Sequence, residues 1–458
     1  MSYVKNSASF RRRSNRSRAR KRGAFTVGLL GFGLVWLIAH AHSTSSAPQA
    51  TVATPPLLKP VPPSAPLPVW SGSDRSRVKK DLASAFAPAI NGAAGWSFAV
   101  VDSVGRTLFD DRAHDAVAPA SAQKLIVAAS ALDALGAGYR YHTIFADRDG
   151  IGSDGRIAGD LWLIGSGDPS LQSQDVRNGV GTLWRSGLRR IDGSLRVDVS
   201  ALRGPELNSH WERRDNGQDY AAPVSAISLD GNTIESQQNA GGSEIKVWTP
   251  VANAAQYAAT QAGAMLAARG VSTAGRPSIA AAPLDAVVLW DHRSAPLAAL
   301  EAHMLFVSDN HYAEQLLRTV GGEIVGDSDD AGGIAAEEQF LQRLDVPMPG
   351  LRLYDGSGLS PDNRVAAITL ARLLAQEEPK LYLLLPLGGR QGTLEDYDFT
   401  TALGRVRAKS GHLSDVAALA GYVTTMHHGR IAFAFIINGS RGDPDAAIVR
   451  AVDRLAML

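Results

Sequence analysis

Cysteine is absent from this chain of 458 residues. That absence excludes thiol nucleophiles, disulfide bonds and zinc sites with sulfur ligands. Metal-binding spacings such as H-E-x-x-H are also missing. We therefore interpret His210, His292, His303 and His311 as surface or satisfied core residues, and we expect no metal ion or other cofactor.

Acidic residues are missing from the N-terminal region, where the first one is Asp74. Residues 1–23 instead carry nine lysine or arginine side chains. The net charge of the whole chain is only +1, so the part beyond this basic region is mildly acidic. We expect no nucleic-acid partner, because nucleic-acid-binding bodies carry clustered positive charge. A DNA-binding N-terminal arm is the less favoured alternative.

The apolar run of residues 24–39 has 16 residues, slightly fewer than the roughly 20 that span a bilayer as a helix. Residues 24–41 are either a signal peptide, with an A-x-A cleavage site at residues 39–41, or a retained inner-membrane anchor. Both interpretations keep residues 1–23 in the cytoplasm and place the remaining chain outside. We predict export to the periplasm or cell envelope.

The segment 42–70 contains eight prolines among small and apolar residues. Such a composition favours an extended chain and cannot pack a core. It predicts a linker that separates the membrane segment from a folded body beginning near residue 71.

The folded body begins and ends with clear strand and helix patterns. Residues 95–108 alternate around a turn and predict a β-hairpin, and residues 124–135 have the apolar spacing of a helix. Near the C-terminus, residues 417–424 and 430–437 predict strands and residues 444–455 a closing helix. Strands from both ends with helices beside them predict an α+β fold, with one antiparallel sheet flanked by helices.

The middle of the chain has a different pattern of short strands, with helices expected near residues 176–189 and 252–269. We expect residues 143–290 to form an insertion of one or two strand-rich subdomains. The catalytic domain would then consist of residues 71–142 and 291–458.

Three short motifs occur in order along the predicted catalytic domain: S-A-Q-K at residues 121–124, S-D-N at residues 308–310 and K-S-G at residues 409–411. A serine hydroxyl becomes a strong nucleophile when a neighbouring base removes its proton. On a helix, Lys124 lies three residues after Ser121 and can reach back to it. Lys124 can act as that base if burial and a second cation lower its pKa.

The other two motifs supply the remaining groups of an acyl-enzyme mechanism. Lys409 is the expected second cation and the partner of a substrate carboxylate. Ser308 is expected to relay a proton to the leaving amine, and Asn310 to hold the backbone amide of the substrate. The oxyanion of the tetrahedral intermediate needs two N–H donors, for which the backbone amides of Ser121 and His412 are the candidates.

The S-x-x-K spacing is a weak signal by itself, since it also occurs at Ser76–Lys79 and Ser243–Lys246. The first of these lies in a polar region typical of a solvated helix end. The second lies in a strand-like run, where alternation puts the two side chains on opposite faces. Only Ser121 opens an apolar helix, so the three motifs in this order make Ser121 the predicted nucleophile.

With these motifs the chain resembles the low-molecular-mass penicillin-binding proteins of the D-alanyl-D-alanine carboxypeptidase/endopeptidase class (the penicillin-binding protein 4 or DacB type, peptidase family S13). The resemblance covers about residues 85–455 and includes residues 159–171, 354–360 (Y-D-G-S-G-L-S) and 404–408. It implies the penicillin-binding, β-lactamase-like transpeptidase fold. It also implies action on peptidoglycan stem peptides and covalent inhibition by β-lactam antibiotics.

The resemblance further implies that Ser410, Gly411 and His412 bind the substrate, and that Asp168 of the insertion contacts its diamino-acid side chain. Ser410 stands where threonine is usual and keeps the hydroxyl, while His412 stands where threonine or serine is more frequent. Asp168 lies in a Gly-Asp-Pro corner, so turn capping is an equally good interpretation. Residues 354–360 are interpreted as a mixture of active-site wall and tight turn.

Two alternatives to a serine-type D-Ala-D-Ala carboxypeptidase/endopeptidase remain open. A serine β-lactamase shares the acylation step, but no Glu between Ser308 and Lys409 has the Asn four residues later that is typical of class A enzymes. A catalytically reduced peptidoglycan-binding protein would keep the fold and lose turnover. We predict hydrolysis of D-Ala-D-Ala peptides through an acyl-enzyme on Ser121.

Overall fold

The computed structural model describes residues 70–240 and 243–458, which belong to one compact unit, Leu67–Leu458. The predicted basic region 1–23, the membrane segment 24–41 and all of the linker 42–70 except Trp70 lie outside the described residues. No helix among the described residues combines the length and the hydropathy needed to cross a membrane.

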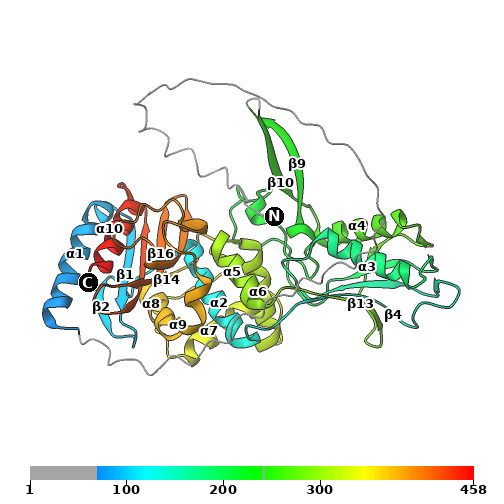
Figure 1. The fold of residues 1–458 in the computed structure, drawn as a ribbon, viewed down its shortest axis with the longest axis horizontal. Coiled ribbons are helices and arrows are strands. Elements are labelled where there is room, and N and C mark those ends of the chain that lie inside the picture. The colour runs from blue at the N-terminus through cyan, green and yellow to red at the C-terminus, as the bar shows by residue number, and fades with distance from the viewer. Residues whose placement is uncertain (1–69, 241–242) are drawn as a thin grey trace, which may run out of the picture. The chain divides into compact units, whose positions relative to one another are not determined.

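An antiparallel sheet of five strands, in the order β15-β16-β17-β1-β2, joins the two ends of the folded chain (Figure 1). Its central pair is β1 with β17, from Gly95 opposite Asn438 to Val101 opposite Ala432. The prediction of one antiparallel sheet built from N- and C-terminal parts is therefore confirmed. The strands are β1 (Gly95–Val101), β2 (Thr107–Asp111), β15 (Val406–Leu413), β16 (Val416–Thr424) and β17 (Arg430–Asn438).

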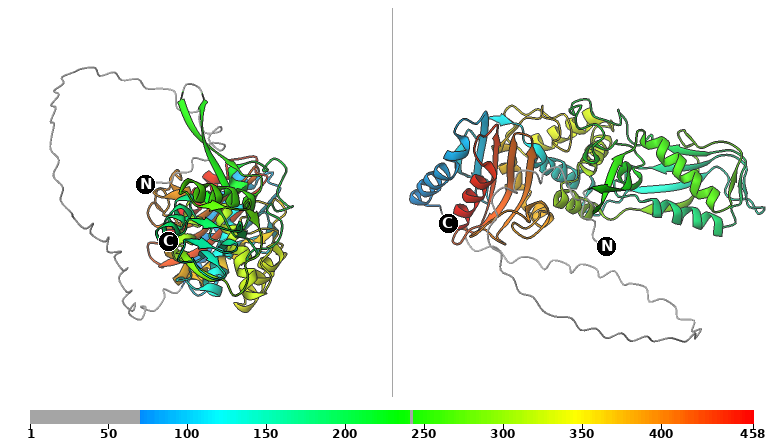
Figure 2. Two further views of the ribbon diagram at one scale, coloured as in Figure 1. Left: turned by 90° about the vertical axis from the view of Figure 1, so that its right-hand side faces the viewer. Right: turned by 90° about the horizontal axis from the view of Figure 1, so that it is seen from above.

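Helices cover both faces of this sheet (Figure 2). Because side chains alternate along a strand, Phe433 and Phe435 of β17 pack toward α1 and α10, while Ala434 packs toward α2 and α8. The small residues on the second face let α8 lie close to β1 and β17. The helices of this part are α1 (Gly72–Ile90), α2 (Lys124–Leu135), α5 (Leu297–Val307), α6 (Asn310–Ile324), α7 (Asp330–Arg343), α8 (Ala367–Gln376), α9 (Glu378–Leu381) and α10 (Pro444–Ala456).

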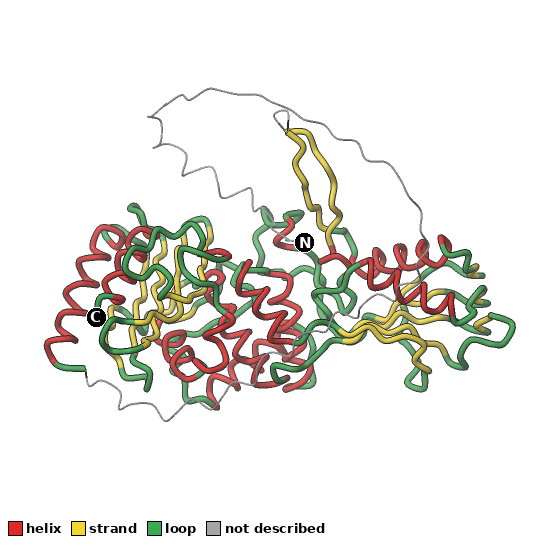
Figure 3. The backbone as a smooth tube through the Cα atoms, viewed as in Figure 1, coloured by secondary structure: helices red, strands yellow, loops and turns green. Residues whose placement is uncertain are grey.

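The middle of the chain forms a second, mixed sheet in the order β12-β8-β6-β4-β13, against which α3 and α4 pack. A small parallel sheet, β11-β7-β5, lies beside it, and β9 pairs with β10 in a long hairpin that stands clear of the other strands (Figure 3). The elements are β4 (His142–Asp147), β5 (Arg156–Ile157), β6 (Leu161–Gly165), α3 (Ser173–Arg185), β7 (Arg190–Ile191), β8 (Leu195–Asp198), β9 (Thr233–Ala240), β10 (Ser243–Pro250), α4 (Ala254–Ala268), β11 (Ser272–Thr273), β12 (Ser278–Ile279) and β13 (Val287–Arg293).

The sequence patterns located several of these elements, but α1 and the helices from α5 to α9 were not predicted. The helix predicted over residues 124–135 coincides with α2, and the hairpin predicted over 95–108 corresponds to β1 and β2. The helix predicted near 176–189 begins and ends earlier, at Ser173 and Arg185. Its start is set by a capping box, in which the side chains of Gln172 and Asp175 bond to each other's backbone amides.

Candidate active site

Ser121 lies in a single 3₁₀ turn, η1 (Ala120–Gln123), which leads directly into α2. Lys124 is the first residue of α2, and its Nζ donates a hydrogen bond to Ser121 Oγ over 2.9 Å. The turn begins at Ala120, which is fully buried and has a left-handed φ of 48°. The predicted nucleophile and base are therefore in direct contact.

The ammonium group of Lys124 is fully buried, and its donors are matched by acceptors. Besides Ser121, Nζ donates to Asn310 Oδ1 at 2.7 Å and to the carbonyl of Ser357 at 2.6 Å. An ammonium group has three N–H donors, so all three are used. When Lys124 is neutral, two N–H groups can keep Asn310 and Ser357 while the nitrogen lone pair points at the Ser121 hydroxyl.

Burial lowers the pKa of Lys124 from 10.5 to about 8. The negative charges of Glu314, Asp355 and Asp309 act in the opposite direction and keep the pKa from falling further. A pKa near the working pH suits a general base, since both protonation states are then accessible.

Lys409, on β15, is the second buried cation of the site. Burial lowers its pKa well below the ordinary lysine value, and the positive charge of Lys124 lowers it further. Its Nζ donates to the carbonyl of Ser410 at 2.6 Å. The charge of Lys124 lowers the pKa of Lys409, but the expected lowering of the Lys124 pKa by a second cation is not found, because burial alone lowers it.

Asn310 begins α6, which Asp309 caps by accepting a hydrogen bond from the Tyr312 amide. Its side-chain Oδ1 faces Lys124, and its Nδ2 donates to the backbone carbonyl of Tyr220 at 2.9 Å. Tyr220 belongs to a short 3₁₀ turn in the middle of the chain, η2 (Asp219–Ala221). Because the amide nitrogen of asparagine carries two N–H donors, Nδ2 can keep the contact with Tyr220 and still donate to a substrate carbonyl.

Ser308 ends α5 in a left-handed conformation with φ 61° and ψ 42°, which turns the chain into α6 two residues before Asn310. Its side chain is half-buried. Within residues 70–240 and 243–458 its hydroxyl makes no hydrogen bond, which leaves it available for the predicted relay of a proton.

The third motif lies against the nucleophile turn. A Cβ added at Gly411 would come within 2.8 Å of the Pro119 carbonyl oxygen and 3.1 Å of the Ser121 nitrogen. Only glycine lets β15 pass the turn this closely. Ser410 Oγ bonds to Thr393 Oγ1 at 2.8 Å, and His412 Nε2 lies 2.9 Å from Asp445 Oδ1 at the start of α10.

The D-G-S-G-L-S segment, called the 355–360 loop below, is fixed between η1 and α6. Gly358 has φ +79°, and a Cβ there would come within 2.0 Å of the Ala120 carbonyl oxygen. A Cβ at Gly356 would come within 2.8 Å of the Ala313 carbonyl oxygen on α6. The loop is thus both an active-site wall, through the Ser357 carbonyl, and a tight turn.

Asp355 organises that turn from inside. Its fully buried carboxylate accepts hydrogen bonds from the Gly358 amide at 2.9 Å, the Ser360 amide at 2.6 Å and Asn363 Nδ2 at 2.8 Å. A fourth donor, Trp211 Nε1 at 3.0 Å, comes from the middle of the chain. Every oxygen lone pair therefore has a partner, as buried carboxylates require.

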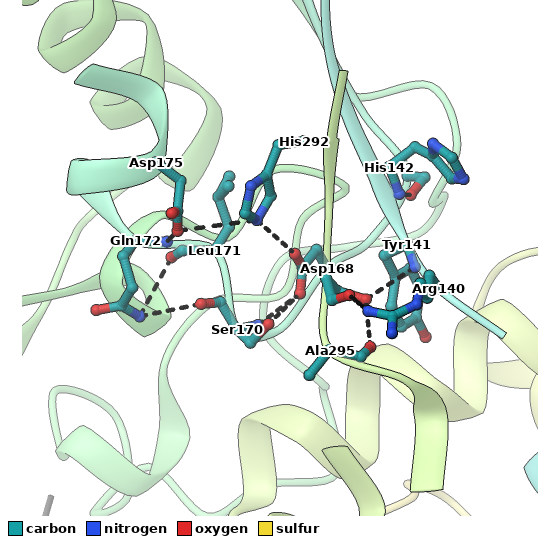
Figure 4. A network of polar contacts seen from close by, with 12 residues as sticks. Arg140, Tyr141, His142, Asp168, Ser170, Leu171, Gln172, Asp175, His292 and Ala295 are labelled. Carbon is teal, nitrogen blue, oxygen red and sulfur yellow. Dashed lines mark hydrogen bonds and ion pairs between the residues drawn. The ribbon is translucent and has the colours of Figure 1, made fainter. Parts of the chain in front are cut away.

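Asp168 lies apart from these contacts, in a second polar cluster (Figure 4). Its side chain is 1% exposed, and Oδ1 accepts hydrogen bonds from the Ser170 amide at 2.8 Å and the Ser170 hydroxyl at 2.6 Å. His292 Nε2 lies 3.9 Å from Oδ2 and 3.8 Å from the carboxylate of Asp175. This geometry supports the turn-capping interpretation, and none of these contacts reaches Ser121 or Lys124.

The two other S-x-x-K pairs lie where their sequence context predicted. Ser76 and Lys79 are both exposed on α1. The second pair lies on β10, where Lys246 bonds instead to Glu235 of the neighbouring strand at 2.7 Å. Neither pair has a buried lysine beside a serine, so neither has the environment of an activated nucleophile.

Sequence reasoning missed several residues of the site. It did not identify Glu314, which lies four residues after Asn310 and therefore on the same face of α6, a spacing that could have indicated it. It also missed Trp211, Tyr220 and Thr393, for which no sequence signal was available because their contacts depend on the fold.

Comparison with known proteins agrees with this geometry. The sequence model of the D-Ala-D-Ala carboxypeptidase 3 (S13) family matches residues 78–250 and 238–457. A D-alanyl-D-alanine carboxypeptidase of Actinomadura sp. (strain R39) is 28% identical, over 83% of this chain and 85% of its own length. A carboxypeptidase of Mycobacterium tuberculosis is 30% identical, over 70% of this chain and 71% of its own length.

The crystal structure of penicillin-binding protein 4 (DacB) from Haemophilus influenzae superposes on this chain with a TM-score of 0.73. The identity is 23%, and the match covers 82% of this chain and 98% of that one. This likeness confirms the predicted α+β fold of the penicillin-binding type. Together with the family match over most of its length, it shows that the chain belongs to the D-Ala-D-Ala carboxypeptidase 3 (S13) family.

Proposed function

We propose that this D-alanyl-D-alanine carboxypeptidase works through an acyl-enzyme on Ser121. The observation that carries the proposal is the 2.9 Å contact between Ser121 Oγ and Lys124 Nζ, in a site where burial lowers the pKa of Lys124 to about 8. A buried lysine with a lowered pKa beside a serine is the arrangement that a serine nucleophile needs for activation.

We assign the steps of the reaction to these groups. Neutral Lys124 takes the Ser121 proton as Oγ attacks the carbonyl carbon of the penultimate D-alanine. The amides of Ser121 and His412 would hold the resulting oxyanion. Collapse of the intermediate breaks the peptide bond, and the proton taken by Lys124 passes through the Ser308 hydroxyl to the leaving D-alanine amine, which restores neutral Lys124. Water then attacks the ester carbonyl and gives a proton to Lys124, and the bond to Ser121 Oγ breaks. The shortened peptide leaves with a terminal carboxyl group, and Ser121 Oγ recovers its proton from Lys124.

Substrate binding is assigned to the edge strand β15. Lys409 and the Ser410 hydroxyl would bind the terminal carboxylate of the peptide, Gly411 would let the strand approach Ser121, and His412 would line the same edge. Contact of Asp168 with a diamino-acid side chain stays a prediction. The substrates are peptidoglycan stem peptides, and β-lactam antibiotics are the covalent inhibitors.

Three further assignments belong to this proposal. Residues 143–290 would form an inserted domain between the catalytic segments 71–142 and 291–458. The enzyme would act in the bacterial cell envelope, and residues 24–41 would either anchor it in the inner membrane or be removed as a signal peptide.

The test is release of D-alanine from a stem pentapeptide by the full-length chain and by a Ser121→Ala variant, with fluorescent penicillin as a second probe. We expect D-alanine release and a long-lived penicillin adduct, both lost in the variant. Rapid turnover of penicillin would favour a β-lactamase instead. A folded wild-type chain that gives neither product nor adduct would favour a catalytically reduced wall-binding protein.

A further inference from the structure

Glu314 of α6 holds the 355–360 loop. Its Oε1 accepts a hydrogen bond from the Ser357 amide at 2.8 Å, and its Oε2 accepts one from the Gly356 amide at 3.1 Å. The side chain is 1% exposed. A carboxylate that binds two successive amides in a water-excluded site makes strong, directional contacts. These bonds fix the position of the loop relative to α6.

Ser357, whose amide binds Glu314, also contacts Lys124, the predicted base. Ser357 donates its amide to Glu314 and accepts a hydrogen bond from Lys124 Nζ on its carbonyl oxygen. Asn310, which contacts Lys124 directly, lies one helical turn before Glu314. The helix α6 therefore reaches Lys124 twice, once through the Asn310 side chain and once through Glu314 and the Ser357 peptide.

We propose that Glu314 is a positioning residue for acylation, which holds the 355–360 loop on α6 and so aims the Ser357 carbonyl at Lys124. The inference rests on the proposed role of Lys124 as base and deepens it. With both carbonyl acceptors in place, the nitrogen lone pair of neutral Lys124 has one direction left, toward Ser121. Without Glu314, Lys124 keeps Asn310 as an acceptor and loses the second constraint on its orientation.

The charge of Glu314 adds an effect that can be measured separately. Burial, together with the charges of Asp355 and Asp330, raises the pKa of Glu314 to about 8, although the two amide donors act in the opposite direction. Glu337 of α7 also faces this group, and burial raises its pKa well above the ordinary value. Ionised Glu314 raises the pKa of Lys124, so removal of that charge should lower it.

The test compares Glu314→Gln with the matched control Glu337→Gln in the full-length chain. Glutamine has the shape of glutamate, but it loses the charge and offers an N–H group to an amide that needs an acceptor. In Glu314→Gln, the second-order rate of acylation by fluorescent penicillin should fall by about 10- to 100-fold. The acidic limb of its pH profile should move to lower pH, because the pKa of Lys124 falls.

The control separates this role from a merely structural one. Both carboxylate oxygens of Glu337 lack a hydrogen-bond partner among the described residues, so Glu337→Gln should keep the wild-type rate and profile. The inference is overturned if Glu314→Gln folds and is acylated with the wild-type rate and pH profile, even if its melting temperature falls. Failure of the proposed function would look different, because the wild-type chain itself would form no adduct on Ser121.

A second measurement avoids the risk that Glu314→Gln does not fold. In the wild-type chain, the amide proton resonances of Gly356 and Ser357 should move together as Glu314 titrates near pH 8. Resonances that stay fixed through this range would contradict the inference.

Discussion

Two buried polar clusters of this protein differ in how completely their charged groups are paired. Around Lys124, three acceptors match the three ammonium donors, and each acceptor comes from a different segment of the chain. Around Asp168, one carboxylate oxygen binds Ser170, and the other has no hydrogen-bond partner within the described residues and faces His292 at 3.9 Å. Lys124 and Asp168 are themselves both buried, so burial of the central group alone does not distinguish a reactive site.

The difference indicates what each cluster does. Contacts from several segments hold Lys124 in one geometry, which a reacting group requires. Asp168 bonds mainly to a residue two positions away, which is how an aspartate stabilises its own turn. Lys124 and Asp168 therefore differ in the segments that supply their hydrogen-bond partners, and not in how deeply they are buried.

The largest expected effect comes from Lys124→Met. The rate of acylation by fluorescent penicillin should fall by about 10²- to 10⁴-fold, the usual contribution of a general base. The variant should still fold, because a buried apolar side chain of similar length carries no charge to desolvate. The matched control is Lys79→Met, which alters an exposed S-x-x-K lysine and should keep the wild-type rate. Equal rates in the two variants would show that Lys124 is not the base.

Replacement of Gly358 tests how tightly the 355–360 loop is held. Gly358→Ala places a Cβ 2.0 Å from the Ala120 carbonyl at φ +79°, whereas Gly150→Ala has a similar φ of +88° and nothing within 4 Å. The control should cost about 1–2 kcal/mol of unfolding free energy from backbone strain alone. Gly358→Ala should cost more and also slow acylation, as measured by urea unfolding and penicillin binding. An equal loss of unfolding free energy in the two variants would mean that the 355–360 loop accommodates the added Cβ without further destabilisation.

The pH dependence of acylation should report the pKa of Lys124. Because the neutral amine is the base, the rate should rise about tenfold per pH unit below the pKa, which burial lowers to about 8, and level off above it. The measurement is the acylation rate across pH at constant ionic strength. Lys79→Met should follow the same curve as the wild-type chain. A rate that does not rise with pH below about 8 would contradict the assignment of Lys124 as the base.

The smallest effect on activity is expected from Asp168→Asn, which should leave D-alanine release near the wild-type rate. Burial raises the pKa of Asp168 above its ordinary 3.8, so the folded state holds the proton more tightly than the unfolded state. The carboxyl group therefore contributes stability at low pH that is lost as the pH rises through the raised pKa. Urea unfolding should show the variant gaining stability relative to wild type over that range. A large loss of activity would assign Asp168 to substrate binding instead.

The sequence was sufficient for contacts that the chain makes locally. Ser121 and Lys124 are three residues apart at the start of a helix, so their contact follows from helix geometry. The sheet was also predictable, because β1 and β17 are apolar strands at opposite ends of the folded chain. A role for Gly411 in the site was expected from the family resemblance. The close approach of β15 to η1 gives the physical reason for a glycine at this position.

The remaining contacts of the site could not be predicted because they join residues far apart. Lys124 meets Asn310 across 186 positions and Ser357 across 233. Asn310 was expected to hold a substrate amide, and its second role as an acceptor for Lys124 depends on the packing of α6 against α2. Tyr220 reaches Asn310 from the middle of the chain, which no motif indicates.

The central claim is tested most directly by mapping the penicillin adduct. The full-length chain, incubated with penicillin, is digested and analysed by peptide mass spectrometry beside Ser121→Ala. We predict one modified peptide, which contains Ser121 and is absent from the variant. An adduct on another serine, or an adduct that persists in Ser121→Ala, would contradict the account.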